Sequence, residues 1–304
     1  MIMNRSEESP SIDLVTVTFS GDLRLLELQI LSVDQYWQHS DINEYTILIN
    51  DIDHERIKDH LDDFLIRRIS DSLRSRITIK NSTDVGGWDS QQYIKLAAVS
   101  NSSSDWVLVL DSKNHFLKKV TAADYVNNGK GYTYKRKITG SQTKWLAKSL
   151  AYFDLDFDDE SMPTITPYIM NKELVKEMLF HVKNKVQDKY KNKFLSSPEL
   201  KGATEFFLYF AFLKYKGILD DYYIFSDKKG ETLFTVWPQD HSIVKRYLLE
   251  ALDDKYLYLG LHRRRIPQLD EQERFLLGQI WLKILGTEPC DYYLNVYDAE
   301  AGVL

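Results

Sequence analysis

The chain has 304 residues, of which 39 are basic and 45 acidic, and its formal net charge is -6. An acidic balance argues against broad, sequence-independent binding to nucleic acid phosphates. The single cysteine, Cys290, cannot form an internal disulfide, and no Cys/His cluster has the spacing of a structural zinc site. We therefore expect a reducing, cytoplasmic setting.

The first residues, MIMNRSEESPS, are polar and lack the apolar core of a signal peptide. No later apolar run approaches the roughly 20 residues that are needed to span a bilayer. We expect a soluble protein without a transmembrane segment.

The first third of the chain alternates strand-like and helix-like segments. Ile12–Phe19 mixes β-branched and apolar residues, and from Leu23 onwards apolar residues recur at helical spacing. Tyr45–Ile49 is a second strand-like run, and the amphipathic segment His54–Ile69 follows it. The pattern predicts two successive β-α units.

Two more strands and a helix follow in the same alternation. Arg76–Ile79 is a short strand candidate, WDSQQYIKLAAV after Gly87 is a predicted helix, and Trp106–Leu110 is an apolar strand. The succession predicts an α/β fold of Rossmann type, with a mainly parallel sheet flanked by helices on both faces.

Beyond Phe116 the regular alternation fades. We interpret residues 121–160 as irregular structure or short elements. Helices are predicted at residues 171–185, 203–216 and 272–285, with a strand at 256–262. The second part is thus expected to be helix-rich, and we place a boundary near residue 120, between segments 1–120 and 121–304.

Polar residues follow three of the predicted strands. These strand ends are Phe19-Ser20-Gly21-Asp22 after Thr18, Asn50-Asp51, and Asp111-Ser112-Lys113-Asn114. In open parallel sheets the ligand crevice lies outside the carboxyl ends of the strands. We expect the three strand ends to face one crevice.

Asp111 is the strongest candidate for chemistry. A carboxylate at the end of a buried strand could hold a hard divalent cation, which in turn holds a diphosphate. The alternative is an acidic cap on the next turn. Lys113 offers a point charge for phosphate, and Asn114 offers a neutral oxygen for a metal or a ribose.

The predicted helix after Gly87 is rich in side chains that form hydrogen bonds. Gln91 and Lys95 lie four residues apart and share one face, as do Trp88 and Gln92. The alternative is a solvated helix surface with Trp88 as a packing anchor.

Two residues of the second part complete the set of candidates. Glu205 lies where a helix begins, so it is either functional or simply stabilises the helix amino terminus. His262 follows a strand-like run and precedes Arg263-Arg264-Arg265. One strand end would then carry both a metal-binding imidazole and anion-binding guanidinium groups. The alternatives are a structural histidine and a solvated arginine cluster.

The acidic stretch DLDFDDE is a competing metal site by spacing, because it contains two D-x-D patterns. No buried strand precedes it, however, and its composition favours a solvated surface loop. Its acidic residues are Asp154, Asp156, Asp158 and Asp159.

Several segments together resemble a poorly characterised family of bacterial and phage-encoded glycosyltransferase-like proteins with the GT-A fold. The resemblance runs from Val15 to about Arg265, and its most specific parts are the SQQ-x-x-K helix and the L-D-S-K-N strand end. The other segments that carry it are TPYIMNKELVKEML, TEFFLYFAFL and GLHRRR.

The resemblance implies a nucleotide-sugar donor, with a UDP-sugar favoured, and a divalent metal, Mn²⁺ or Mg²⁺, at the diphosphate. The first segment, 1–120, would bind the donor, and 121–304 would bind a glycan or lipid-linked acceptor over Thr166-Pro167-Tyr168. Glu205 resembles the acid that deprotonates the acceptor hydroxyl in inverting members.

The site residues implied by the resemblance fall into two further groups. The metal ligands would be Asp111, Asn114 and His262. The nucleotide-sugar-binding residues would be Thr18, Phe19, Ser20, Asp22, Asn50, Asp51, Trp88, Gln91, Gln92, Lys95, Lys113 and Arg263. Lys113 replaces the second acid of the usual D-x-D motif, which leaves the metal dependence open.

Three other functions compete with a glycosyltransferase. A nucleotide-sugar or glycan-binding module without catalysis is reasonable because Lys113 replaces an acid. A nucleotidyltransferase lacks a Gly-rich signature loop after the first strand. Nucleic acid binding rests on the three arginines alone and is disfavoured by the acidic net charge.

Overall fold

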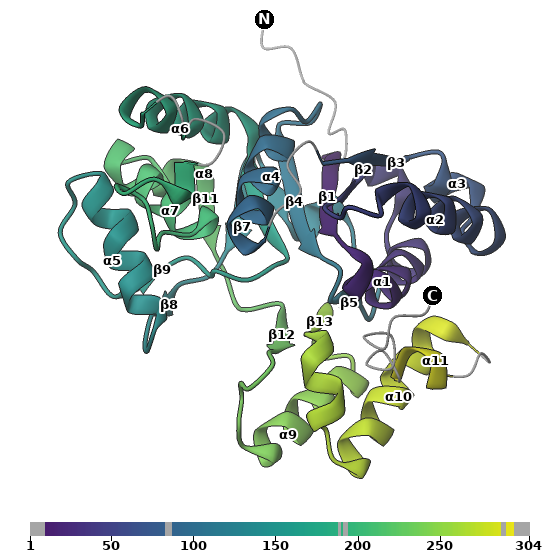
Figure 1. The fold of residues 1–304 in the computed structure, drawn as a ribbon. Coiled ribbons are helices and arrows are strands. Elements are labelled where there is room, and N and C mark those ends of the chain that lie inside the picture. Colours follow the sequence, from purple (N-terminus) through teal and green to yellow (C-terminus); the bar gives the residue numbers. More distant parts are fainter. Residues whose placement is uncertain (1–9, 83–86, 188–189, 191–193, 287–289, 295–304) are drawn as a thin grey trace, which may run out of the picture.

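The computed structural model describes residues 10–82, 87–187, 190, 194–286 and 290–294, without the side chains of residues 88 and 89 (Figure 1). Its main sheet has the strand order β10-β4-β1-β2-β3. The strands are β1 Ile12–Thr18, β2 Ile42–Ile49, β3 Ile77–Asn81, β4 Trp106–Asp111 and β10 Tyr168–Asn171. Only the edge strand β10 runs antiparallel, so the predicted mainly parallel α/β sheet is confirmed.

Helices of the first third connect these strands, as predicted. They are α1 Leu23–Tyr36, α2 His54–Arg68, the short α3 Asp71–Arg74 and α4 Trp88–Ser100. Helix α1 packs against α2 and α10, whereas α4 packs on β1 and β4 and against α6 and α7 (Figure 1). All of β1 is buried, because the central strands of a parallel sheet are covered on both faces.

The second part is helix-rich, as expected. Its helices are α5 Gln142–Tyr152, α6 Lys172–Lys185, α7 Glu205–Lys216, α8 Leu219–Tyr222, α9 His241–Leu252, α10 Glu271–Leu285 and α11 Asp291–Leu294. Its strands besides β10 are β6 Val126–Asn127, β7 Lys130–Thr133, β8 Arg136–Lys137, β9 Glu160–Ser161, β11 Tyr223–Phe225, β12 Gly230–Leu233 and β13 Tyr258–Leu261.

One expectation for the second part is wrong. Residues 121–160 were expected to form irregular structure or short elements, yet they contain the eleven-residue helix α5. Leu146 and Leu150 lie four residues apart, are fully buried, and belong to the face of α5 that packs on α7. Tertiary packing of this narrow apolar face stabilises the helix within a polar sequence.

The two parts of the chain share their sheets. Strand β10 extends the main sheet, while β5, Asn114–Phe116, pairs with β13, which in turn pairs with β12. The C-terminal lobe of β12, β13, α9 and α10 lies below the main sheet in Figure 1. The boundary near residue 120 stays a prediction. No helix in the described ranges is both long and apolar enough to cross a bilayer.

A buried histidine of β5, His115, joins helix α10 of this lobe to helix α1. Trp281 Nε1 of α10 donates to His115 Nδ1 at 3.3 Å, so the other ring nitrogen carries the proton and donates to the Leu25 carbonyl at 3.3 Å. Burial lowers the pKa of His115 to about 4. The imidazole is therefore neutral in the folded protein near neutral pH.

This arrangement predicts an acid-sensitive contribution to stability. Between about pH 6.5 and pH 4 the unfolded chain protonates His115 and the folded chain does not, so stability falls as pH falls. We expect His115→Gln to remove about 2 kcal/mol of the loss in unfolding free energy between about pH 7 and pH 4.5. Urea unfolding at both pH values measures the difference.

His54→Gln is the matched control, because the His54 side chain is 38% exposed on α2. The control should lose as much stability on acidification as the unaltered chain. An equal loss in His115→Gln would contradict the assignment.

Candidate active site

The polar ends of three strands meet at one edge of the main sheet, as the sequence predicted. Ser112 Oγ donates to Thr18 Oγ1 at 3.2 Å and joins the ends of β4 and β1. The backbone N–H of Ser20 donates to Asp51 Oδ2 at 2.8 Å and joins the ends of β1 and β2. Hydrogen bonds from Ser20 and the backbone outweigh burial and lower the pKa of Asp51.

Asp111 lies at the centre of this edge, held by two ammonium groups. Lys95 Nζ is 2.6 Å from Asp111 Oδ1, and Lys113 Nζ donates to Oδ2. Thr166 Oγ1 also donates to Oδ2, at 2.9 Å. Burial opposes the charged carboxylate, but Lys113 and Lys95 outweigh burial and hold the pKa of Asp111 well below its usual range.

The turn that carries Asp111 is fixed by two buried amides. Asn114 Oδ1 accepts from the Asp111 backbone N–H at 2.8 Å, and Asn114 Nδ2 donates to the Thr166 carbonyl at 3.1 Å. Gln29 Nε2 of α1 donates to the Asp111 carbonyl, while Gln29 Oε1 accepts from Thr16 and Tyr45. Sequence reasoning missed Gln29, whose signal is a lone amide on the apolar face of α1.

Lys95 connects Asp111 with Glu205. Lys95 Nζ lies 3.5 Å from Glu205 Oε1, and the Glu205 backbone N–H donates to Gln92 Oε1 at 3.1 Å. Burial raises the pKa of Glu205, and Lys95 only partly offsets this rise. Burial would lower the pKa of Lys95, but Asp111 and Glu205 raise it overall.

His262 and Arg263 reach the same edge from the end of β13. The Leu261 N–H donates to the Lys113 carbonyl at 2.9 Å, which sets the two segments side by side. His262 Nδ1 accepts from the Arg264 backbone N–H at 3.2 Å. Burial, reinforced by Lys113 and Arg263, lowers the pKa of His262 to about 4.

Arg263 in turn meets the end of β1. Its Nη1 lies 2.9 Å from Asp22 Oδ1, and its guanidinium carbon lies 4.7 Å from the centroid of the Phe19 ring. Burial raises the pKa of Asp22, although Arg263 opposes this rise. A cation, an acid and an aromatic face are thus brought together from distant parts of the sequence.

Of the other sequence candidates, Asn50 lies at this edge, and Gln91 and Trp88 lie on the first turn of α4. Asn50 is buried, and its N–H donates to the Thr18 carbonyl at 2.7 Å. Gln91 is half-buried on the first turn of α4. Trp88 begins α4, and its side chain lies outside the described part of the structure.

Two of the three predicted metal ligands, Asp111 and Asn114, have their side-chain oxygens engaged by other protein groups. Both oxygens of Asp111 carry ammonium hydrogen bonds, the Asn114 oxygen is buried and accepts from the backbone, and His262 Nδ1 accepts from Arg264. A hard divalent cation takes about six ligands, which include water and phosphate oxygens, but it needs at least one or two protein carboxylates to be free and is repelled by neighbouring ammonium groups. In this arrangement the predicted residues do not fit such a cation.

Two other clusters of acidic side chains form ion pairs or hydrogen bonds with protein partners. In DLDFDDE, Asp158 pairs with Lys214 at 2.7 Å and Asp159 with Lys137 at 3.0 Å. These pairs agree with the interpretation of a solvated loop.

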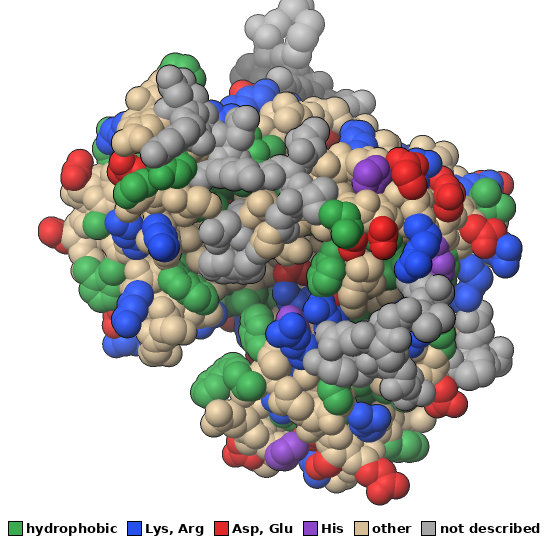
Figure 2. Space-filling view, viewed as in Figure 1, with side chains coloured by type: hydrophobic (Ala, Val, Ile, Leu, Met, Phe, Trp, Pro, Cys, Tyr) green, Lys and Arg blue, Asp and Glu red, His purple; other side chains and the backbone are tan. Residues whose placement is uncertain are grey.

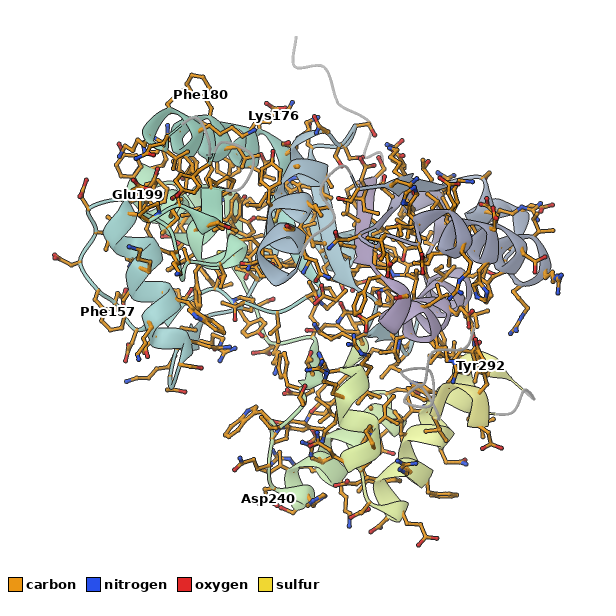
Figure 3. The ribbon with its side chains drawn as sticks, viewed as in Figure 1. Phe157, Lys176, Phe180, Glu199, Asp240 and Tyr292 are labelled. Carbon is orange, nitrogen blue, oxygen red and sulfur yellow. The ribbon has the colours of Figure 1, made fainter. Side chains whose placement is uncertain are left out.

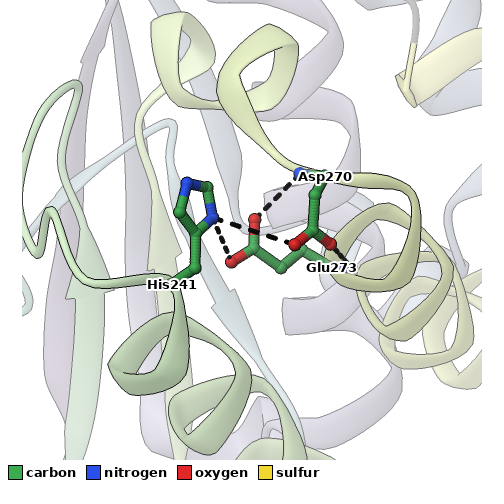
Figure 4. A group of neighbouring side chains, drawn as sticks. All are labelled: His241, Asp270 and Glu273. Carbon is green, nitrogen blue, oxygen red and sulfur yellow. Dashed lines mark hydrogen bonds and ion pairs between the residues drawn. The ribbon is translucent and has the colours of Figure 1, made fainter.

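The second group consists of His241, Asp270 and Glu273, between α9 and α10 (Figure 4). Among the described residues only this group combines three or more ligand atoms within reach of one ion. Asp270 and Glu273 form the capping box of α10, and Lys245 lies 3.0 Å from Asp270. The helix cap therefore explains Asp270 and Glu273, and His241 Nδ1 lies 2.8 Å from Glu273 Oε1.

The profile of a family of unknown function, DUF6492, matches residues 11–258. The chain belongs to this family. No curated protein matches the chain.

The solved structures that are similar to this chain include two glycosyltransferases. The bifunctional glycosyltransferase WbbM has a TM-score of 0.55 and 12% identity, over 95% of this chain and 52% of WbbM. The galactosyltransferase LgtC, solved with donor and acceptor sugar analogues, has a TM-score of 0.50 and 10% identity, over 93% of this chain and 99% of LgtC. The chain spans about half the length of WbbM. At such low identity the likeness shows the fold, which is glycosyltransferase-like.

The buried charge group predicts an unequal effect of two lysine substitutions. Lys95→Met leaves Asp111 and Glu205 without their shared cation, and removing one partner of a buried pair costs about 3–5 kcal/mol. Lys58→Met breaks only the exposed pair with Asp62, and such surface pairs contribute little to stability. Urea unfolding of both variants tests this contrast, and equal losses would show that Lys95 is not a structural counter-charge.

Proposed function

We propose that the chain is a GT-A type glycosyltransferase that moves a sugar from a nucleotide-sugar donor to a hydroxyl of a glycan or lipid-linked acceptor. A UDP-sugar is the favoured donor. The observation that carries the proposal is the cluster of Lys95, Asp111 and Lys113 at the carboxyl end of β4, where open α/β sheets bind their ligands. The glycosyltransferase-like fold supports the same function.

The donor diphosphate would be held by cationic side chains. An ammonium group has three N–H donors, so Lys95 and Lys113 can keep Asp111 and still donate to phosphate oxygens. Arg263 adds a guanidinium from the end of β13. Fixed cations of this kind stabilise the negative charge that develops on the leaving diphosphate.

The nucleoside would lie over the ends of β1 and β2. Phe19 offers an aromatic face, Asp51 offers a carboxylate, and Thr18, Ser20, Asp22 and Asn50 line the same edge. Gln91 would meet the donor from α4, and Trp88 stays a prediction from the sequence because its side chain lies outside the described residues. Gln92 and Asn114 are both buried, and we assign to them the positioning of Glu205 and Asp111.

We also propose that the lysines take the place of the divalent metal. Lys113 stands where the D-x-D motif has its second acid, and it already neutralises Asp111. His262 would then stay a neutral imidazole that caps the following turn and faces the donor. No step of the proposed reaction passes through a metal.

Glu205 would act as the general base of an inverting reaction. Burial raises the pKa of Glu205, which suits a proton acceptor. The acceptor oxygen bonds to the anomeric carbon, the bond from that carbon to the phosphate oxygen breaks, and Glu205 takes the acceptor proton. The nucleoside diphosphate leaves with the electron pair, beside Lys95 and Lys113.

A binding module without catalysis is the second candidate. Lys113 in place of an acid favours it, because the same cations would hold a nucleotide sugar without turning it over. For either function we propose a reducing, cytoplasmic setting, because the single cysteine cannot form an internal disulfide.

Calorimetric titration of UDP, GDP, CDP and dTDP in buffer with EDTA tests the proposal. We expect one nucleotide, UDP first, to bind, and Lys113→Met to weaken its binding at least about tenfold, because a charge-assisted contact is worth about 1.5–3 kcal/mol. Lys176→Met, on the exposed surface of α6, should bind as the unaltered chain does (Figure 3).

Glu205→Gln separates the two candidates. It should keep nucleotide binding and lose release of sugar from the donor that binds. Binding without sugar transfer or donor hydrolysis by the unaltered chain would favour the binding module. Binding of none of the four nucleotides would contradict both.

A further inference from the structure

A large cleft opens between the segment around β8 and the C-terminal lobe. It has a volume of about 790 Å³. Clefts of about 300–1,000 Å³ are typical of small-molecule sites. Figure 2 shows the molecule hollowed between these two regions, with basic side chains at the inner end of the hollow. None of the residues predicted from the sequence as site residues lines this cleft.

The lining of the cleft combines aromatic faces with hydrogen-bonding groups. Trp237 is 66% exposed and lines the cleft with Phe234 and Tyr247. Arg136 and Gln142 lie on the opposite side and are bonded to each other at 3.0 Å. A large exposed aromatic side chain in a concave, partly polar surface is typical of a binding site, because both its face and its rim find partners there.

The cleft lies beside the candidate active site. Phe234 lines the cleft, and its ring centroid lies 5.9 Å from Lys113 Nζ. Ile165 also lines the cleft, and its neighbour Thr166 donates to Asp111. A molecule in the cleft would therefore lie next to the side chain of Phe234, which in turn lies beside Lys113, one of the cations that we assign to the donor diphosphate.

We propose that this cleft binds the saccharide part of the acceptor, with a sugar ring stacked on Trp237. A sugar ring has a face of C–H groups and a rim of hydroxyls, which match an aromatic face and the polar groups of Arg136 and Gln142. The volume admits more than one ring. This inference rests on the proposed transferase function and names the chemical class of its acceptor.

An array of neutral and acidic oligosaccharides, probed with the full labelled chain, tests the proposal. We expect the unaltered chain to bind a subset of the saccharides, and Trp237→Ala to bind that subset at least about tenfold more weakly, as for loss of a buried aromatic contact. Phe180→Ala is the control, because Phe180 is 71% exposed and points outward from α6 (Figure 3). A second variant, Tyr247→Ala, should weaken binding of the same saccharides.

Nucleotide binding by calorimetry distinguishes failure of this inference from failure of the proposed function. Trp237→Ala should bind the nucleotide as the unaltered chain does, which also shows that the variant is folded. If nucleotide binding is present but saccharides bind equally well to Trp237→Ala, or bind to neither chain, the acceptor cleft is wrong and the donor site stands. Absence of nucleotide binding overturns the proposed function itself.

Discussion

A buried carboxylate between two ammonium groups is the interaction on which the candidate site depends. Asp111 comes from β4, Lys113 from the following turn, and Lys95 from α4. Taking these charges out of water is costly, and only their mutual attraction and hydrogen bonds compensate for it. Because Lys95 also meets Glu205 of α7, the same group fixes the strand end, two helices and the proposed base relative to one another.

The turn after β4 has a second role, because it joins the main sheet to the C-terminal lobe. Asn114 begins β5, and β5 pairs with β13, whose end delivers His262 and Arg263. The amides of Asn114 and Gln29 hold the backbone of this turn. The donor side of the site and the proposed acceptor cleft therefore share one rigid support.

The fold of the first third could be predicted because its patterns are local. Apolar strands end in polar residues, helices show their spacing, and parallel strands bring their carboxyl ends to one edge. Helix α5 was missed because its apolar face is narrow and its stability comes from packing on α7.

The residues of the candidate site could be predicted from the sequence, but the ion pairs and hydrogen bonds between them could not. Asp111, Glu205 and Arg263 were each found from their position at an element end, and Lys95 was found from the helix face that it shares with Gln91. Their pairing depends on which helix packs on which strand, and that information is absent from local sequence. For the same reason the sequence suggested Asn114 as a ligand, whereas its amide holds the turn, and it gave no sign of the cleft around Trp237.

The central claim is that lysine side chains take the place of a divalent metal. Electron paramagnetic resonance of Mn²⁺ tests this claim most directly. The unaltered chain should leave added Mn²⁺ free at this edge of the sheet. Lys113→Asp, which restores an acid two residues after Asp111, should bind Mn²⁺. Binding by the unaltered chain that Asp111→Ala abolishes would contradict the account.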